Sequence, residues 1–208
     1  MHTTHSKFYE AALRDLRPTQ ITVGYAEVVA KQMEWKRLKK SERKDFLSNH
    51  WFPAVRGPEE EFYIIDHHHL GKALLDIGVK KSRIVLLKDL SHLALDEFWL
   101  FMAHQQWVHP YDAKGKRRSV RQIPHTLDGL LDDPYRSLAG EVRQAGGFPK
   151  DTTPYAEFLW ADFFRRRIKT ALVIQFPTQA LEQALSICHS AEASHLPGWT
   201  GLILQGKE

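Results

Sequence analysis

The first half of the chain alternates short apolar runs with amphipathic segments. Apolar runs at 51–57 and 62–66 flank the turn-forming stretch PEEE, which predicts a β-hairpin. A further run at 82–90 predicts another strand. Apolar side chains at helical spacing predict helices from about Ala26 to residue 38, over 70–77 and over 95–108, and the charged segment 38–50 is also expected to be helical.

The pattern changes from Pro110 onward. Residues 110–124 are basic and rich in turn formers, which is typical of a loop or linker. Short helices are expected within 126–147. An aromatic helix is expected from Thr153, as its cap, to residue 168, with Pro154 in its first position, and a final helix over 177–193. The pattern therefore predicts an α/β (α+β) core over residues 1–109 and a mostly helical extension over 110–208 packed on it.

Composition narrows the class of protein. The chain has 208 residues, a formal charge of +4 and one cysteine, Cys188. A single thiol excludes an intrachain disulfide framework and a zinc site built from cysteines, and it agrees with a cytoplasmic location. We expect neither a signal peptide nor a membrane span, because no long uninterrupted apolar stretch occurs. The mildly basic charge permits a phosphate-bearing partner.

The segment FYIIDHHHL places three histidines where a strand passes into a helix. Asp66 is expected to cap that helix, and His67, His68 and His69 follow it. The first turn of a helix carries a partial positive charge that favours phosphate or another anion. Imidazoles there can donate hydrogen bonds to phosphate oxygens, and Asp66 could hold a histidine tautomer or bind a metal.

Three interpretations of this corner stay open at this point. The histidines could be structural, they could bind a transition metal, or they could handle phosphate. Neighbouring side chains on a helix point about 100° apart, and the i, i+4 histidine pair of H-E-x-x-H is absent. A transition-metal site is therefore the least favoured of the three.

The segment PAVRGPEEEFYIIDHHHLGKALLDIGV, residues 53–79, resembles the core motif of the ParB/sulfiredoxin superfamily. It is most similar to the ParB-like nuclease branch, and LRPTQITVGYAEVVAK at 16–31 also resembles that branch. The likeness covers about residues 13–90, and the segments 132–148 and 154–168 resemble the extension of the same branch. The resemblance implies a ParB/sulfiredoxin-like core with a small mixed sheet, followed by a helical extension.

In the wider superfamily this corner reads D-G-H-H-R and binds nucleotide phosphates. Asp66, His68 and His69 match that motif, whereas His67 replaces the glycine and Leu70 replaces the arginine. Leucine cannot make the bidentate phosphate contacts of a guanidinium. Lys72, two residues further on, could supply positive charge instead.

The resemblance also implies roles before the hairpin. Thr19 and Gln20 match the polar turn that orients a nucleotide or its metal, and their alternative role is that of an ordinary loop. Glu27, near the start of the first long helix, matches the acidic residue that acts as base in kinase-like relatives. Its alternative role is that of an exposed helix residue.

The resemblance implies a phosphoryl-handling enzyme, which is a nucleotide hydrolase, a phosphotransferase or a nuclease. Its catalytic residues would be Glu27, Asp66 and His68. The expected cofactor is Mg²⁺ with a nucleoside triphosphate or diphosphate, with Asp66 as the candidate metal ligand. The residues expected to bind phosphate or nucleotide are Thr19, Gln20, His67, His68, His69 and Lys72.

The alternative function is a non-catalytic module that binds a nucleotide or a nucleic-acid backbone, and the leucine at position 70 favours it. A basic run could contact that backbone, although such runs are more often solvated loops. Sulfiredoxin activity is not expected, because no cysteine lies in the corner. The basic run consists of Lys114, Lys116, Arg117, Arg118 and Arg121.

Overall fold

The computed structural model describes residues 7–201 of the chain, which form two compact units. Within these residues the first unit comprises 7–23, 27–112 and 116–131, and the second comprises 24–26, 113–115 and 132–201. The mixed α+β class expected from the sequence is confirmed. The division into domains at residue 109, with the extension packed on the core, stays a prediction.

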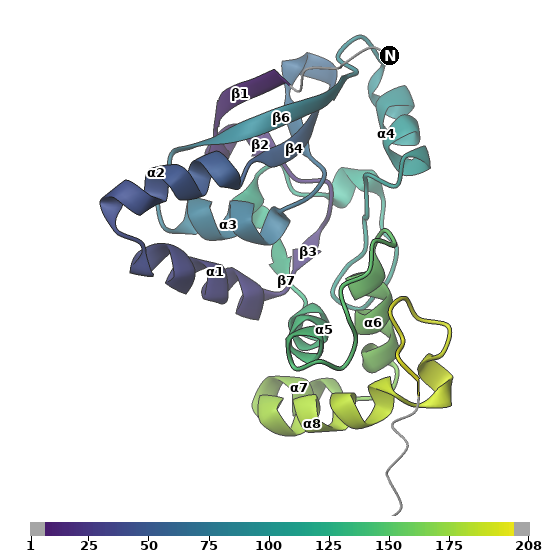
Figure 1. Ribbon diagram of the computed structural model, residues 1–208. Coiled ribbons are helices and arrows are strands. Elements are labelled where there is room, and N and C mark those ends of the chain that lie inside the picture. The colour runs from purple at the N-terminus through teal and green to yellow at the C-terminus, as the bar shows by residue number, and fades with distance from the viewer. Residues whose placement is uncertain (1–6, 202–208) are drawn as a thin grey trace, which may run out of the picture. The chain divides into compact units, whose positions relative to one another are not determined.

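The first unit is built on a five-stranded mixed sheet with the strand order β1-β6-β4-β5-β2 (Figure 1). The strands β4 and β5 form the antiparallel hairpin that the apolar pattern predicted, with Val55 opposite Tyr63. β6 runs parallel to β4, and β2 runs parallel to β5. The strands are β1 (Lys7–Ala12), β2 (Leu16–Arg17), β4 (Phe52–Arg56), β5 (Phe62–Ile64) and β6 (Lys81–Asp89).

Each face of the sheet has its own apolar core. Phe52 and Ile64 point into one core together with side chains of α1 (Tyr25–Arg37), α2 (Lys40–Asn49) and α3 (His68–Asp76). Val55 and Tyr63 point into the other core, which α4 (Leu95–His104) covers. Figure 1 shows α2 and α3 on one side of the sheet and α4 on the other. The four helices expected in this half of the chain are thereby confirmed.

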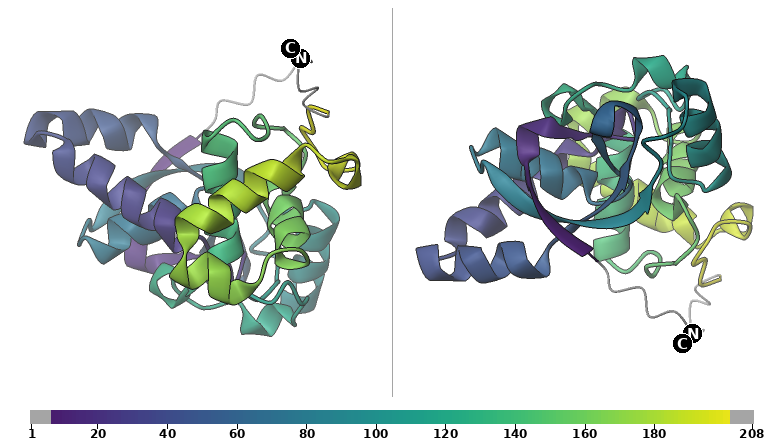
Figure 2. Two further views of the ribbon diagram at one scale, coloured as in Figure 1. Left: turned by 90° about the horizontal axis from the view of Figure 1, so that it is seen from below. Right: turned by 90° about the horizontal axis from the view of Figure 1, so that it is seen from above.

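The sheet is curled so that its first strand approaches its fourth. The rings of Tyr9 on β1 and Phe62 on β5 lie 6.0 Å apart between centroids, although two strands separate β1 from β5 in the sheet. The view from above shows β1 running beside β6 at the margin of the sheet (Figure 2, right). The short 3-10 helix η1 (Leu13–Asp15) joins β1 to β2 and buries Leu13 completely.

The corner between β5 and α3 follows the expected order with a different cap. α3 begins at His68, and its N-cap residue is His67, which has a left-handed backbone (φ 63°). The Asp66 carboxylate accepts the backbone N–H of its neighbour His67 at 2.6 Å and makes no helix cap, so the cap prediction was wrong. Gly78 ends the helix with φ 81°, a conformation that glycine adopts without steric cost.

Within the described residues the second unit has four α-helices, and their buried side chains include an aromatic cluster. Their ribbons are coloured green to yellow in Figure 2, left. Trp160 stacks on Phe148 with centroids 4.2 Å apart. The aromatic helix begins two residues later than expected, after Tyr155, so Thr153 is not its N-cap. The short helix α7 (Thr170–Gln175) was not expected from the apolar pattern. The helices are α5 (Pro134–Gln144), α6 (Ala156–Arg165), α7 (Thr170–Gln175) and α8 (Pro177–Cys188).

Candidate functional site

His68 is the buried member of the histidine triplet. Its residue is 4% exposed, and its Nε2 accepts the backbone N–H of Thr19 at 3.0 Å. A backbone N–H can only donate, so Nε2 carries no proton and neutral His68 has its proton on Nδ1. The Thr19 hydroxyl lies 3.3 Å from the same nitrogen and donates to the carbonyl of Ile64 at 2.9 Å. These contacts join the turn after β2 to the end of β5 and to the start of α3.

His67 occupies the position at which the superfamily motif has glycine. Its positive φ explains why glycine suits that position, because a left-handed backbone costs an ordinary residue roughly 1–2 kcal/mol. Two hydrogen bonds hold His67 in this conformation. Its N–H donates to the Asp66 carboxylate, and its Nδ1–H donates to the carbonyl of Trp51 at 2.9 Å.

His69 forms a carboxylate–imidazole pair with Glu27. The distance from His69 Nδ1 to Glu27 Oε2 is 3.6 Å, and the two side chains are 12% and 24% exposed. Glu27 lies in the first turn of α1 and also faces Lys31, whose Nζ is 3.5 Å from Oε1. The carboxylate favours a proton on Nδ1 of His69, which gives Nε2 the lone pair that a base requires.

Leu70 and Lys72, one and three residues after His69, serve the helix and its core. Leu70 is 4% exposed and packs among the side chains between α3 and the sheet. The Nζ of Lys72 lies 3.1 Å from Asp76 Oδ1 and 3.3 Å from the carbonyl of Asp128. The corner therefore receives no guanidinium from position 70, and the role of Lys72 in phosphate binding stays a prediction.

Gln20 and His109 lie beside Thr19. Gln20 is 6% exposed and forms an isolated parallel bridge with His109, whose N–H donates to the Thr19 carbonyl at 2.9 Å. The imidazole of His109 stacks on Tyr111 at 4.2 Å between centroids. The structure thus brings Thr19, Gln20, Glu27 and the histidines together. It adds His109, to which the sequence assigned no role because nothing in its neighbourhood along the chain links it to the corner.

The corner offers few protein ligands to a metal. Within residues 7–201 no group of three or more histidine, cysteine, aspartate or glutamate side chains is placed to hold a metal ion. Asp66 is exposed, and one of its carboxylate oxygens accepts the His67 N–H. Mg²⁺ is commonly held by one or two carboxylates together with substrate phosphates. The residues present therefore fit a Mg²⁺ ion that arrives with a phosphate substrate and takes Asp66 as a protein ligand.

The basic run is exposed. The Arg118 guanidinium pairs with Asp112, with Nε 2.7 Å from Oδ2, and Arg117 bridges to Tyr111 across the turn between them. A solvated turn accounts for this arrangement, and nucleic-acid binding by the run stays a prediction. The exposed cations are Lys114, Lys116, Arg117, Arg118 and Arg121.

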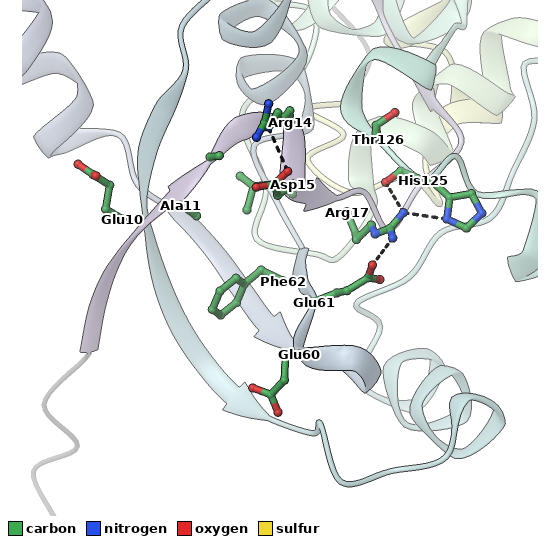
Figure 3. A pocket seen from close by; sticks show the side chains of 12 residues that line it. Glu10, Ala11, Arg14, Asp15, Arg17, Glu60, Glu61, Phe62, His125 and Thr126 are labelled. Atoms are coloured by element: carbon green, nitrogen blue, oxygen red, sulfur yellow. Dashed lines mark hydrogen bonds and ion pairs between the residues drawn. The ribbon is translucent and has the colours of Figure 1, made fainter.

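A pocket of about 640 Å³ opens between the curled edges of the sheet (Figure 3). Arg17 crosses one side of it, where the guanidinium pairs with Glu61 and donates to Nδ1 of His125 at 2.8 Å and to its carbonyl at 2.9 Å. The hydrogen bond with Glu61 raises the pKa of Arg17. None of the corner residues lines this pocket, and its charged walls are paired with one another or with neighbours.

Comparisons with known proteins agree with the resemblance seen in the sequence. The family described as "Putative ParB-like nuclease" matches residues 9–166. The crystal structure of protein Atu1540 from Agrobacterium tumefaciens superimposes with a TM-score of 0.91 at 44% sequence identity, covering 96% of this chain and 100% of that one. No curated protein is significantly similar. Among the described residues, no helix is both long and apolar enough to cross a membrane.

Proposed function

The chain belongs to the ParB-like nuclease family, and on this premise we propose that the corner at Asp66–His69 binds phosphate and that the protein cleaves phosphodiester bonds. The observation that carries the proposal is the Glu27–His69 pair, which lies at the N-terminal turn of α3. A positive helix end can hold a phosphate, and a carboxylate-backed imidazole beside it can take a proton from water.

In this mechanism each corner residue has one task. The backbone N–H groups in the first turn of α3 hold the phosphate oxygens, and His67 donates its Nε2–H to one of them as an imidazolium, because its Nδ1–H is engaged by the Trp51 carbonyl. Water attacks phosphorus while Nε2 of His69 accepts its proton, and Glu27 stabilises the imidazolium that forms. The bond from phosphorus to the leaving oxygen then breaks, and that oxygen takes up a proton from solvent. A bound Mg²⁺ would neutralise charge on the substrate phosphate.

His68 has a different task in this proposal from the catalytic one expected from the sequence. Its Nε2 is engaged by the Thr19 N–H, so it positions the start of α3 against the turn after β2. We assign proton transfer to His69, whose Nδ1 faces the carboxylate of Glu27. Asp66 holds the backbone of His67 and is the candidate metal ligand.

The experiment measures cleavage of bis(p-nitrophenyl) phosphate and of a labelled oligonucleotide, each with Mg²⁺ and with EDTA. The variants are His69→Ala and Glu27→Gln, and His92→Ala is the matched control because His92 is an exposed histidine outside the corner. We expect loss of about 10²–10⁴-fold in kcat for His69→Ala. Full activity in a folded His69→Ala protein would contradict the assignment of the base.

A non-catalytic binding module is the second candidate function. Leu70 favours it, because a buried leucine stands where the superfamily motif has arginine. The same experiment separates the two functions. Salt-dependent binding of the oligonucleotide by the wild type, with no cleavage under either condition, would support the module and overturn the nuclease.

A further inference from the structure

We propose that Phe8 and Trp51 form a stacking surface for the bases of a single-stranded nucleic acid whose phosphate is held by the corner. This inference rests on the proposed function and names its substrate class. Phe8 and Trp51, together called the aromatic ledge, come from β1 and from the residue that precedes β4.

The two rings of the aromatic ledge contact each other at the surface. Their centroids lie 6.4 Å apart with an interplanar angle of 82°, and Phe8 is 53% exposed. Phe8 lies opposite Val85 of β6, and Val85 lies opposite Pro53 of β4. This row of cross-strand neighbours connects Phe8 with β4, the strand next to β5. An aromatic ring held by an edge-on neighbour at a sheet surface presents a face on which a base can stack.

The aromatic ledge is tied directly to the histidine corner. The Trp51 carbonyl accepts the Nδ1–H of His67 at 2.9 Å, and His67 is the N-cap residue of α3. His67 also packs edge-on against Phe52, with centroids 6.3 Å apart, but Phe52 points to the opposite face of the sheet from Pro53, Val85 and Phe8. A strand whose phosphate meets the first turn of α3 would pass round the start of β4 at Trp51 and reach Phe8 on the other face of the sheet.

The same sheet face carries the cations Arg83 and Lys81 and the carboxylate of Glu10, which lies opposite Arg83 and pairs with Lys81 at 2.7 Å. Side chains alternate between the two faces of a strand, so Arg83 shares a face with Val85 and with Phe8 across the strand pair. Arg83 is exposed, and a cation beside stacking rings is typical of surfaces that follow a phosphate backbone. A stable protein interface needs roughly 1,200–2,000 Å² of buried surface, which two rings do not provide. Duplex DNA is also a poor fit, because its bases are already stacked on one another.

The test is the binding of a labelled oligothymidylate, measured by fluorescence anisotropy at fixed salt. Phe8→Ala removes the ring and Phe8→Leu keeps an apolar side chain without an aromatic face. Leu100→Ala is the matched control, because Leu100 is an exposed apolar residue on α4. We expect Phe8→Ala and Phe8→Leu both to weaken binding by about 5- to 150-fold and the control to leave it unchanged.

A second arm uses an abasic strand of the same length, which keeps the phosphates and lacks the bases. We expect the wild type and Phe8→Ala to bind it equally. If the Phe8 variants bind oligothymidylate as the wild type does, or if Phe8→Leu alone does, base stacking on Phe8 is contradicted. Phosphate binding by the histidine corner is not contradicted by that result. If the wild type binds neither strand, the proposed function itself fails and the inference fails with it.

Discussion

The backbone N–H of Thr19 donates to Nε2 of His68 at 3.0 Å, which joins the turn after β2 to the first residue of α3. Both residues are almost fully buried, at 2% and 4% exposure. The bond leaves only one neutral tautomer for His68, because the acceptor nitrogen cannot also carry the proton. Within the histidine triplet, His68 is therefore buried and held by Thr19, whereas His67 and His69 lie nearer the surface.

Replacing His68 by alanine should cost stability because it leaves the buried Thr19 N–H without its acceptor. We expect a loss of about 1–3 kcal/mol in the free energy of unfolding, measured by urea denaturation. His68→Gln is the matched variant, since a glutamine carbonyl oxygen can take the place of Nε2, and it should recover part of that loss. A long-range ¹H–¹⁵N spectrum should show the Nδ1–H tautomer for His68. The Nε2–H tautomer would contradict the assigned hydrogen bond.

Replacing Lys72 by methionine should affect the helix more than the phosphate site. The ammonium contacts Asp76 and the carbonyl of Asp128, so its loss leaves a carboxylate with no cation beside it. We expect a stability loss of about 1–3 kcal/mol and a change of no more than about two-fold in KM for a phosphodiester. Asp76→Asn serves as control, because it removes the carboxylate charge from the Lys72–Asp76 pair and keeps the Lys72 ammonium. A large rise in KM with unchanged stability would instead support the phosphate role expected from the sequence.

The Cys188 thiol should be unreactive in the folded protein. It is fully buried in the core of the second unit and donates to the Leu185 carbonyl at 3.1 Å. Burial raises the pKa of Cys188 to about 11, so at pH 8 about one thiol in a thousand is ionised. We expect negligible reaction with Ellman's reagent at pH 8 and one equivalent in guanidinium chloride. Rapid labelling of the native protein would show that the thiol is accessible.

Local patterns predicted most of the elements that build the corner. The hairpin and α3 follow from spacings within a few residues, and Gly78 marks the helix end. The strand β1 was not predicted. It lies at the edge of the sheet and has six residues, which show only a weak alternation of apolar and polar side chains. The short helix α7 gives an equally weak pattern.

The division of roles among the histidines could not be predicted. His68 and His69 are adjacent in sequence, and which of them meets Thr19 and which meets Glu27 depends on how α3 lies against β2 and α1. The resemblance placed Thr19 and Glu27 near the corner without giving their partners. The acceptor bond at His68 and the pair at His69 are tertiary contacts, so they emerge only once those elements are packed together.

Arg17 should stabilise the first unit by holding the segment that contains His125 against β2. Its guanidinium pairs with Glu61 and donates to the ring and the carbonyl of His125, as Figure 3 shows. We expect Arg17→Ala to lower the free energy of unfolding by about 1–3 kcal/mol, because it removes several charge-assisted bonds together. Arg14→Ala is the matched control, since Arg14 is an exposed arginine at the same pocket whose pair with Asp15 is solvated. An equal effect of the two substitutions would contradict the role of Arg17.

Tyr63 should make the first unit sensitive to strong alkali. Burial, together with the charge of Glu61 and the hydrogen bond that the hydroxyl donates to it at 3.2 Å, raises the pKa of Tyr63 to about 12. A group whose pKa is higher in the folded state gives stability that is complete below its unfolded pKa, about 10, and that is lost as the pH rises through its folded pKa. We expect the stability difference between the wild type and Tyr63→Phe to shift by about 2–3 kcal/mol between pH 9.5 and pH 12. Urea unfolding at several pH values measures this shift, and phenolate absorbance in the two proteins gives the titration directly. A Tyr63 phenolate that forms near pH 10 in the native protein would overturn the prediction.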